Sequence, residues 1–482
     1  MALAPLLLLS YSFESQALSA TTSERIHGTA PYLTFDGGVT KVTKIEDLLG
    51  IKLSDGRTFT SQNNSSSPTA PIKLPNVGDT LADIEMIVPP LSDSININDL
   101  VTQGKWGDDD GDGQEAGGIT ALGSISLAIT DKDGNAVSRG DALDICRAPY
   151  KVTLNSSGGT LATQYGVPNS SRFYGGTAEY YITPSQPVIC SVRPNLLLGG
   201  TTDIDYSDNP RFAGPSSIWS PTKGFLVQST NPSSYNRNFP TTGADGLYFD
   251  LDIGGIDASQ LNWTVNTSGS IRATVRWTRP LTGTFRDPDG NTIQADSWIT
   301  DKSKNVTRVT LSGPRANSSQ ISSSNPGSLT RPSLPQTFEL VGRDSSGNEV
   351  RYGFVLKQWF VNRGQEKLYR DQLAWCNSLG YRMPRVRDLT NAVCSGWSAG
   401  SWCQGAVGAT PSSSNNVYKR HIGAGFFTEW GGMNRYPDAG FVFQYYWTSD
   451  ATGSSQFAVT SGYGLVASFI ASTSRSGLCT AP

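Results

Sequence analysis

Four of the six cysteines in this 482-residue chain lie in its last quarter, where they constrain the fold more than any other feature. Cys376 comes at the end of a helix-like segment, Cys394 and Cys403 lie close together, and Cys479 is near the end of the sequence. Zinc is disfavoured, because the chain has no Cys-x-x-Cys spacing and only two histidines. Cysteines in an exported chain are expected to form disulfides, since an oxidising compartment preserves them. The pattern therefore predicts a small C-terminal recognition module held together by disulfides.

The beginning of the sequence has the character of a secretory signal peptide. An apolar run extends from Leu3 to Leu9 and small residues follow it, although the positively charged region that normally precedes such a run is missing. We expect the signal to occupy residues 1–20 and the protein to be exported to the cell surface or the extracellular space. No later segment approaches the roughly 20 apolar residues of a membrane-spanning helix, so no transmembrane span is expected.

Composition indicates a mainly β protein with several domains. Only 16% of the residues are charged, while 51 glycines and 27 prolines are typical of many short strands joined by turns. A chain of 482 residues is too long for one hydrophobic core. Its 38 basic and 41 acidic residues give a net charge of −3, so no nucleic-acid partner is expected.

Three short segments share the pattern Asp-x-x-Gly-Asn, at residues 131–135, 287–291 and 344–348. Each is a candidate hairpin turn, because Asp can accept hydrogen bonds within its own turn while Gly and Asn tolerate a positive φ. Apolar residues alternate with polar ones before the third segment, as at Phe338 and Leu340, and this period of two is typical of half-buried strands. The pattern predicts Ig-like β-sandwich modules that use the same hairpin.

Polar stretches rich in Pro and Ser divide the chain into expected domains. The clearest of them, residues 312–335, contains almost nothing that could be buried. After the signal peptide we expect a β-sandwich module at residues 21–145, a middle β module at 146–315, a linker with a short β segment at 316–362, and a C-terminal module at 363–482.

The C-terminal module begins with a helical pattern. Tyr369, Leu373 and Cys376 recur at helical spacing and Gly380 can serve as a C-cap, so a helix would place Cys376 on its inner face. A second short helix is expected over residues 385–393. Loops and aromatic-rich strands follow, which makes this module α+β.

The segment Gly-Tyr-Arg-Met-Pro at residues 380–384, the strand Tyr-Trp-Thr-Ser-Asp at 446–450 and the final cysteine resemble the C-terminal C-type-lectin-like domains of intimin/invasin-type bacterial adhesins. The preceding β modules fit the Ig-like stalk of that family only in type. The resemblance implies a lectin-like fold with a role in surface binding. Because no counterpart of the family's outer-membrane barrel is found, release from the cell and anchoring by an outer-membrane partner are both left open.

The resemblance also implies a disulfide pairing. Six cysteines allow many connectivities, and arithmetic alone does not choose among them. By analogy with the family, the expected pairs are Cys376–Cys479, Cys394–Cys403 and Cys146–Cys190.

A surface of aromatic loops is the expected binding site. Calcium-dependent sugar binding, as in true C-type lectins, needs paired carboxylates and amides, but the chain has Tyr436-Pro437-Asp438 and no Trp-Asn-Asp strand motif. Docking through exposed aromatic side chains with polar groups at the rim is favoured instead. The residues expected to contact a receptor are Glu429, Trp430, Asn434, Arg435, Tyr436, Asp438, Trp397 and Trp402.

An acidic segment of the first module begins like a calcium-binding loop. Asp108, Asp110 and Asp112 hold positions 1, 3 and 5, but position 12 is Ile119, where an EF-hand has a bidentate Glu. Two interpretations stay open: a structural Ca²⁺ held by the three aspartates and backbone carbonyls, or a solvated acidic turn. No other cofactor is expected.

Catalysis has little support in the sequence. Neither His27 nor His421 lies in a nucleophile motif, and the cations Lys419 and Arg420 beside His421 disfavour a neutral base. We expect no enzyme, but an exported bacterial surface adhesin whose lectin-like domain binds a protein or glycan on a host or neighbouring cell. Two alternatives stay open: a secreted carbohydrate-binding or carbohydrate-active protein, and a purely structural surface subunit.

Overall fold

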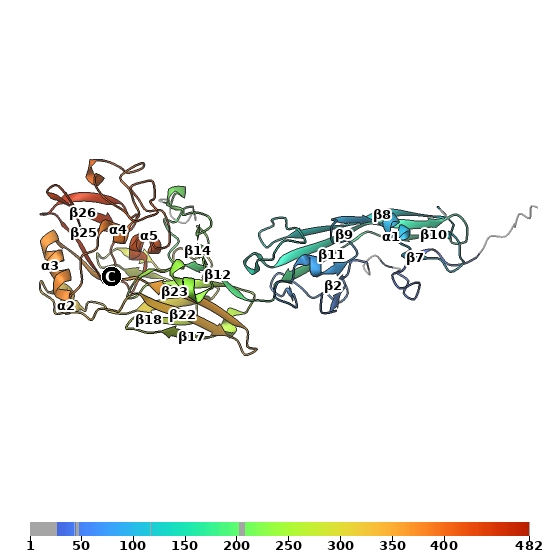
Figure 1. Cartoon of the computed structure of the whole chain (residues 1–482), viewed down its shortest axis with the longest axis horizontal. Helices are drawn as coiled ribbons and strands as arrows, with labels where there is room; N and C mark the ends of the chain where they lie inside the picture. Colours follow the sequence, from blue (N-terminus) through green and yellow to red (C-terminus); the bar gives the residue numbers. More distant parts are fainter. Residues whose placement is uncertain (1–26, 43, 45–47, 116, 202–207, 482) are drawn as a thin grey trace, which may run out of the picture. The chain divides into compact units, whose positions relative to one another are not determined.

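The computed structural model describes residues 27–481 except 43, 45–47, 116 and 202–207. The expected signal peptide lies outside these residues. The described residues form two compact units, the first containing those up to 143 together with 149–183, and the second containing 144–148 and those from 184 onward (Figure 1). With 36% strand and 12% helix the chain is mainly β, as the composition predicts. No helix in the described part of the chain is long and apolar enough to cross a membrane.

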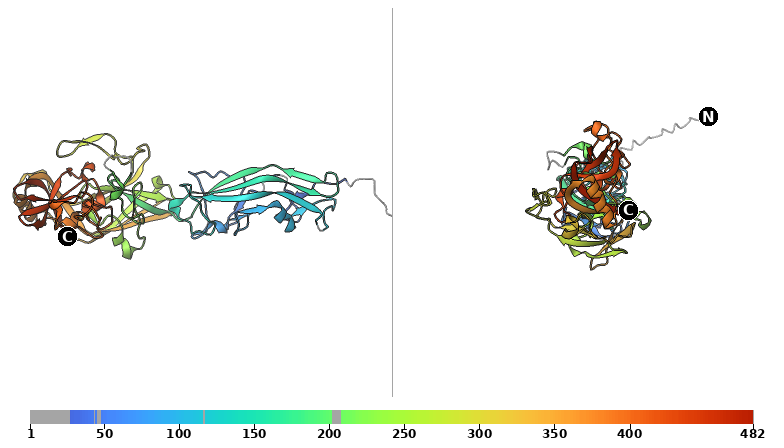
Figure 2. Two further views of the ribbon diagram at one scale, coloured as in Figure 1. Left: turned by 90° about the horizontal axis from the view of Figure 1, so that it is seen from above. Right: turned by 90° about the vertical axis from the view of Figure 1, so that its left-hand side faces the viewer.

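A six-stranded sheet organises the first unit, in the order β4-β11-β9-β8-β6 with β10 paired to β9. Its strands are β4 (Ile72–Lys73), β6 (Ser94–Asn96), β8 (Ile119–Thr130), β9 (Tyr150–Thr163), β10 (Ser170–Phe173) and β11 (Gly176–Thr183). The long antiparallel strands β8 and β9 run side by side and align Leu127 with Leu154 (Figures 1 and 2). Ile125, Leu127 and Ile129 of β8 are buried while Ser126 and Ala128 between them are exposed, so the alternation in sequence becomes one buried and one solvated face.

Shorter elements complete the first unit. They are β1 (Tyr32–Leu33), β2 (Ile51–Lys52), β3 (Thr58–Phe59), β5 (Glu85–Met86), β7 (Trp106–Gly107) and helix α1 (Ile97–Thr102). Helix α1 begins after Asn96, and its apolar residues Ile97, Leu100 and Val101 are buried beside the main sheet.

The first unit extends further along the chain than the boundary expected at residue 145. Strand β9 pairs with β8 and β11 pairs with β9, so the sheet continues to Thr183. Residues 144–148 instead belong to the second unit, where Cys146 is bonded to Cys190. Local composition does not reveal this division, because strand pairing joins segments that no local pattern connects.

The second unit begins with a region of two facing sheets, residues 184–357, called the β region below. One sheet has the order β13-β14-β12-β16-β21-β18 and the other has the order β17-β22-β23. The strands are β12 (Val188–Arg193), β13 (Trp219–Ser220), β14 (Gly224–Leu226), β16 (Tyr248–Gly254), β17 (Asn262–Thr267), β18 (Arg272–Thr278), β21 (Val306–Ser312), β22 (Gln336–Arg343) and β23 (Glu349–Leu356). Phe249 on β16 meets Phe354 on β23 edge to face at 5.9 Å between ring centroids, which joins the apolar faces of the sheets into one sandwich core.

All three Asp-x-x-Gly-Asn segments form the predicted turn. In each one the backbone N–H of the Asn donates to the Asp carboxylate, at 2.9, 2.8 and 2.8 Å, and the Gly has a φ near +83°. The second turn joins β19 (Thr284–Arg286) to β20 (Thr292–Gln294), and the third joins β22 to β23. The hairpin prediction is confirmed because the turn chemistry is local and needs no tertiary partner.

The C-terminal part, residues 358–481, is called the lectin-like domain below. Its sheet has the order β15-β24-β28-β25-β26-β27. The strands are β15 (Thr242–Ala244), β24 (Gln358–Leu368), β25 (Tyr445–Thr452), β26 (Ser455–Thr460), β27 (Val466–Ile470) and β28 (Ser474–Ala481). Because β15 comes from the β region and pairs in parallel with β24, one sheet contains residues from both parts of the second unit.

The first predicted helix of this domain is present. Helix α3 (Tyr369–Leu379) ends at Gly380, whose φ of +83° makes it the left-handed C-cap, and it buries Cys376. Two shorter helices follow, α4 (Val386–Leu389) and α5 (Phe426–Trp430). Helix α4 stops before the expected residue 393, because Thr390 already has an extended backbone.

The stretch expected to be a linker is packed against the lectin-like domain. It contains helix α2 (Ser318–Ser322), which lies beside α3 in Figure 1. Trp375 donates its indole N–H to the carbonyl of Gln320 at 2.8 Å, and the Tyr381 hydroxyl donates to the carbonyl of Thr330 at 2.8 Å. The segment has few apolar side chains, so its sequence gives no sign of packing. Its backbone carbonyls nevertheless accept hydrogen bonds from buried aromatic residues.

The three expected disulfides are all present. The bonded pairs are Cys376–Cys479, Cys394–Cys403 and Cys146–Cys190, with Cα separations of 5.4, 5.3 and 5.4 Å. The first closes the lectin-like domain by joining α3 to β28, and the second closes a short surface loop.

Candidate functional site

The segment that carries most of the expected receptor contacts is buried. Glu429 and Trp430 are 0% exposed, Tyr436 is 1% exposed and Asn434 is 7% exposed. Trp430 donates its indole N–H to the carbonyl of Thr242 at 3.0 Å and packs 4.9 Å from the ring of Phe239. The prediction that these side chains form an exposed binding surface is therefore wrong.

Glu429 shows why this segment is buried. Its carboxylate accepts hydrogen bonds from the backbone N–H and hydroxyl groups of Thr241 and Thr242 and from the N–H of Gly423. Burial raises the pKa of Glu429, and these hydrogen bonds act in the opposite direction. The charge joins the lectin-like domain to the β region instead of facing a receptor.

Tyr436 and Arg420 belong to the same internal contact. The Tyr436 hydroxyl accepts from the N–H of Asn195 at 2.9 Å and donates to the carbonyl of Trp430 at 3.1 Å. The Arg420 guanidinium is fully buried and lies 4.3 Å from the ring of Trp219 in the β region. The local sequence of an aromatic-rich segment does not show whether it faces solvent or a neighbouring domain. The structure is needed to distinguish these two cases.

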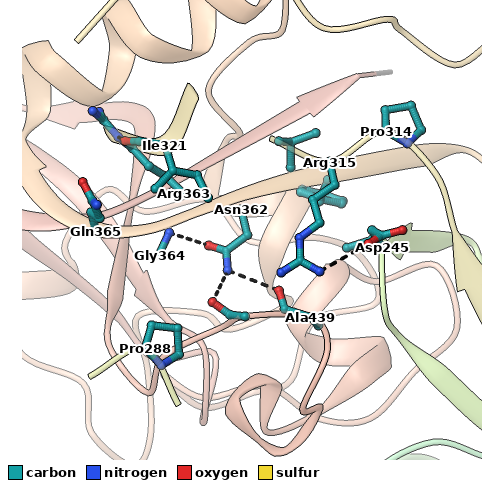
Figure 3. A pocket seen from close by; sticks show the side chains of 14 residues that line it. Asp245, Pro288, Pro314, Arg315, Ile321, Asn362, Arg363, Gly364, Gln365 and Ala439 are labelled. Carbon is teal, nitrogen blue, oxygen red and sulfur yellow. Dashed lines mark hydrogen bonds and ion pairs between the residues drawn. The ribbon is translucent and has the colours of Figure 1, made fainter. Parts of the chain in front are cut away.

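Arg435 is half-buried and Asp438 is exposed. The residues that follow, Ala439 and Gly440, line a cavity of about 260 Å³ between the β region and the lectin-like domain (Figure 3). Arg315 donates to the carbonyl of Asp438 at 2.6 Å and forms an ion pair with Asp245 at 3.4 Å. Asn362 donates to the carbonyl of Gly440 at 2.6 Å. Because these polar groups already bond one another, we assign the cavity to the packing between the two parts of the second unit.

Trp397 and Trp402 differ from the other expected contact residues, because they are 49% and 45% exposed. Both lie in the segment from Cys394 to Cys403, which is called the tryptophan loop below and is closed by a disulfide between residues nine positions apart. Tryptophan is a large apolar side chain that usually contributes to a core, so two half-exposed indoles in one short loop need a reason.

The tryptophan loop is held in one conformation by hydrogen bonds. The N–H of Trp397 donates to the side-chain oxygen of Asn415 at 2.9 Å. The carbonyl of Ser398 accepts from the Asn416 side chain at 2.9 Å and from the indole N–H of Trp402 at 3.3 Å. Ser398 has a φ of +61°, a conformation unfavourable for a residue with a side chain, and such strain is concentrated at functional sites.

Each indole of the loop is covered on one face. The guanidinium of Arg211 lies 4.2 Å from the ring centroid of Trp397. The ring of Trp402 lies directly against Gly400, since a Cβ added at that glycine would come within 2.3 Å of the ring. The exposed halves of the two side chains are therefore their opposite faces and edges.

Positions 389–418, which include the loop, contain no acidic or basic residue, so the cation beside Trp397 comes from a distant segment. The exposed polar groups near the indoles in sequence are hydroxyls and an amide, as at Ser395, Ser401 and Gln404. Arg211 comes from a distant part of the sequence and could not be expected from it. The absence of charged residues from positions 389–418, in contrast, can be read from the sequence and is the signal that distinguishes this loop as a candidate site.

The acidic segment of the first unit is only partly arranged as a cation site. Asp109 pairs with Lys41 and accepts from Tyr32, and Asp112 accepts from the N–H of Tyr165 at 2.8 Å. Burial, followed by the hydrogen bond with Asp110, raises the pKa of Asp108 from 3.8 to about 6. Within the described ranges no group of three or more His, Cys, Asp or Glu side chains is placed to hold a metal ion, so calcium binding stays a prediction.

A second set of buried charges lies inside the β region. Arg308 bonds both Asp250 and Asp296 at 2.8 Å, and Tyr248 donates to Asp296 at 2.5 Å. These two carboxylates are 2% and 0% exposed, and each is occupied by the arginine between them. The arrangement stabilises the sandwich core and offers no open acid–base pair.

Comparison with known proteins gives similarity at the level of fold. No protein-family model matches the chain, and no curated protein matches its sequence. Among solved structures, a bacterial integrin-binding invasin aligns over 75% of this chain at 11% identity and a TM-score of 0.32, and the chain spans about half (51%) of that protein's length. A C-terminal intimin fragment aligns over 75% of this chain and 93% of its own, at 10% identity and a TM-score of 0.29.

A third solved structure, the adhesin InvE of Yersinia pseudotuberculosis, aligns over 78% of this chain and 90% of its own at 9% identity and a TM-score of 0.12. The invasin and intimin structures are of the type that the C-terminal motifs resemble. At these identities the likeness concerns the fold alone.

Proposed function

We propose that this chain is an exported bacterial surface adhesin whose lectin-like domain binds a receptor on a host or neighbouring cell through the tryptophan loop. The observation that carries this proposal is the pair of half-exposed indoles, Trp397 and Trp402, held on a loop closed by a disulfide. Large aromatic residues fixed at a surface are the usual anchors of binding interfaces, because they bury much area at little cost in conformational entropy.

The partner is proposed as a cell-surface molecule, without a named receptor. The invasin structure is described as that of an integrin-binding protein, and the intimin fragment was solved with the intimin-binding domain of its translocated receptor. Attachment of this chain to the cell by an outer-membrane partner is part of the same proposal. The alternative of a purely structural surface subunit predicts no cell binding at all.

The test uses the 482-residue chain without its expected signal peptide, labelled and measured by flow cytometry on epithelial cells and on bacterial cells. We expect W397A/W402A to lower cell binding about tenfold or more, since anchor residues of an interface dominate its free energy. Trp277→Ala is the matched control, because Trp277 is 41% exposed on β18, away from the lectin-like domain. Equal binding by wild type and the double variant would refute the proposed site, and absence of binding by the wild type would favour the structural subunit.

A further inference from the structure

The ligand chemistry of the tryptophan loop can be narrowed further, on the basis of the proposed function. A ligand must match three properties of the loop: one open face on each indole, hydroxyl and amide groups at the rim, and no acidic or basic residue over positions 389–418. From these properties we infer that the tryptophan loop binds an uncharged glycan without a metal ion.

The open indole faces are suited to contact with a sugar ring. A sugar ring presents a flat face of C–H groups, which is attracted to the negative face of an aromatic ring and loses little water on contact. Because Arg211 covers one face of Trp397 and Gly400 covers one face of Trp402, the two open faces are presented by rings that are already held in place. Fixed rings avoid the ordering cost that a flexible loop would pay on binding.

The polar side chains next to the indoles in sequence are suited to hydrogen bonds with sugar hydroxyls. Ser401 and Gln404 are exposed and can each donate and accept hydrogen bonds, whereas the exposed Ser395 hydroxyl donates to the carbonyl of Ser414 at 3.1 Å and can only accept from a ligand; together they match sugar hydroxyls in both roles. The segment from 389 to 418 supplies no charged side chain that could complement charges on a protein partner.

The charged groups near the loop disfavour an acidic glycan and a calcium-dependent ligand. An acidic glycan would need cations at the open face, but the Arg211 guanidinium lies on the covered side of Trp397 and bonds the side chain of Asn209 at 3.0 Å. Calcium-dependent recognition would need carboxylates, and the nearest acidic residue before the loop in sequence is Asp388, whose carboxylate is bonded to Arg382. An uncharged oligosaccharide is the class that these groups fit.

A glycan array tests the inference with the full-length chain, in buffer containing EDTA. The array carries uncharged, sialylated and sulfated oligosaccharides, and the strongest hit is titrated by calorimetry. We expect binding to uncharged glycans that EDTA does not change, a loss of about tenfold or more in affinity for W397A and for W402A, and unchanged affinity for the control W277A. Binding restricted to sialylated or sulfated glycans, or abolished by EDTA, overturns the inference.

Cell treatment separates this inference from the proposed function. Periodate destroys the vicinal diols of surface glycans, whereas a protease removes surface proteins. We expect cell binding of the wild type to be lost after periodate treatment. If binding depends on Trp397 and Trp402 but survives periodate and is lost after protease treatment, the adhesin proposal stands and the glycan inference is wrong; if the double variant binds cells normally, both are wrong.

Discussion

At the scale of single residues, the role of a side chain is decided by what faces it. Trp430 and Trp402 have the same chemistry and lie in the same domain, yet the first is 0% exposed and the second is 45% exposed. Trp430 bonds the backbone of the β region, whereas Trp402 bonds only its own loop. The first contributes to stability and the second is available to a ligand.

Glu429 gives a residue-scale prediction about stability. In Glu429→Gln the side-chain NH₂ replaces an acceptor that faces the N–H and hydroxyl groups of Thr241 and Thr242, so donors would confront donors. We expect a loss of about 2–4 kcal/mol in the unfolding free energy of the second unit, measured by denaturant titration. Asp438→Asn, at an exposed carboxylate, is the control and should change little; an equal effect of both variants would contradict the assignment.

Asp108 gives a residue-scale prediction about pH. Its pKa is raised from 3.8 to about 6 in the folded protein, so between these pH values the folded state keeps a proton that the unfolded state releases. The free energy of unfolding therefore falls as pH rises from 3.8 to about 6. Asp108→Asn should therefore raise the stability of the first unit at pH 7, by about 1 kcal/mol after allowance for solvent screening. Melting temperatures at pH 4 and pH 7 check this, with a gain expected only at pH 7.

The same variant tests calcium at the acidic segment. If Ca²⁺ binds Asp108, Asp110 and Asp112, added calcium should raise the melting temperature of the wild type, and Asp108→Asn should remove that rise. Without calcium binding, the wild type melts at the same temperature with calcium or with EDTA.

At the scale of elements, the tryptophan loop combines a short disulfide with strained backbone. The bond between Cys394 and Cys403 closes a loop of nine positions, and Ser398 with its φ of +61° lies between the two indoles. A loop of this length without a disulfide would sample many conformations, and the relative placement of its aromatic rings would be lost.

Removing this disulfide should therefore affect binding more than folding. We expect C394S/C403S to lower cell binding severalfold while costing less than about 3 kcal/mol of stability, because only a short loop is released. C146S/C190S is the matched control, since it removes a disulfide of the second unit that is outside the lectin-like domain. Cell binding by C394S/C403S at the wild-type level would show that the fixed loop is not needed.

At the scale of the whole molecule, the β region and the lectin-like domain form one compact unit. They share a sheet through the pairing of β15 with β24, and one continuous core runs from Phe249 to Trp430 and on to Tyr446. Buried polar groups such as Glu429 and Arg420 find their partners across this contact. A cut between the two parts would expose both the apolar surface and unpaired charges.

Residues 364–482 produced alone are accordingly expected not to fold. They would lack β15 and most of β24, together with the partners of Trp430, Tyr436 and Glu429. Circular dichroism and limited proteolysis should show an unstructured fragment, while a fragment of residues 184–482 carrying Cys190→Ser should resist protease. A cooperative thermal transition in the short fragment would refute this.

Several features of the chain could be predicted because they depend on neighbours in sequence. The three Asp-x-x-Gly-Asn turns, the alternation in β8 and the C-cap of α3 at Gly380 are local, and the structure confirms them. The disulfide pairs were reached through family resemblance, and the structure confirms those as well. The boundary at residue 145 and the exposed loop at Glu429 to Tyr436 were wrong, because each depends on which distant segment lies opposite.

The class of the molecule can therefore be inferred from the amino-acid sequence: a mainly β chain with hairpins made by local turn chemistry and a C-terminal module crossed by disulfides. Which aromatic residues are available to a ligand depends on the three-dimensional packing. The physical reason is that an indole gains free energy from leaving water in either setting, whether against Phe239 in a core, as Trp430 does, or against a ligand, as we propose for Trp397 and Trp402. The sequence records that tendency, and the packing of the β region against α5 determines which residues satisfy it internally.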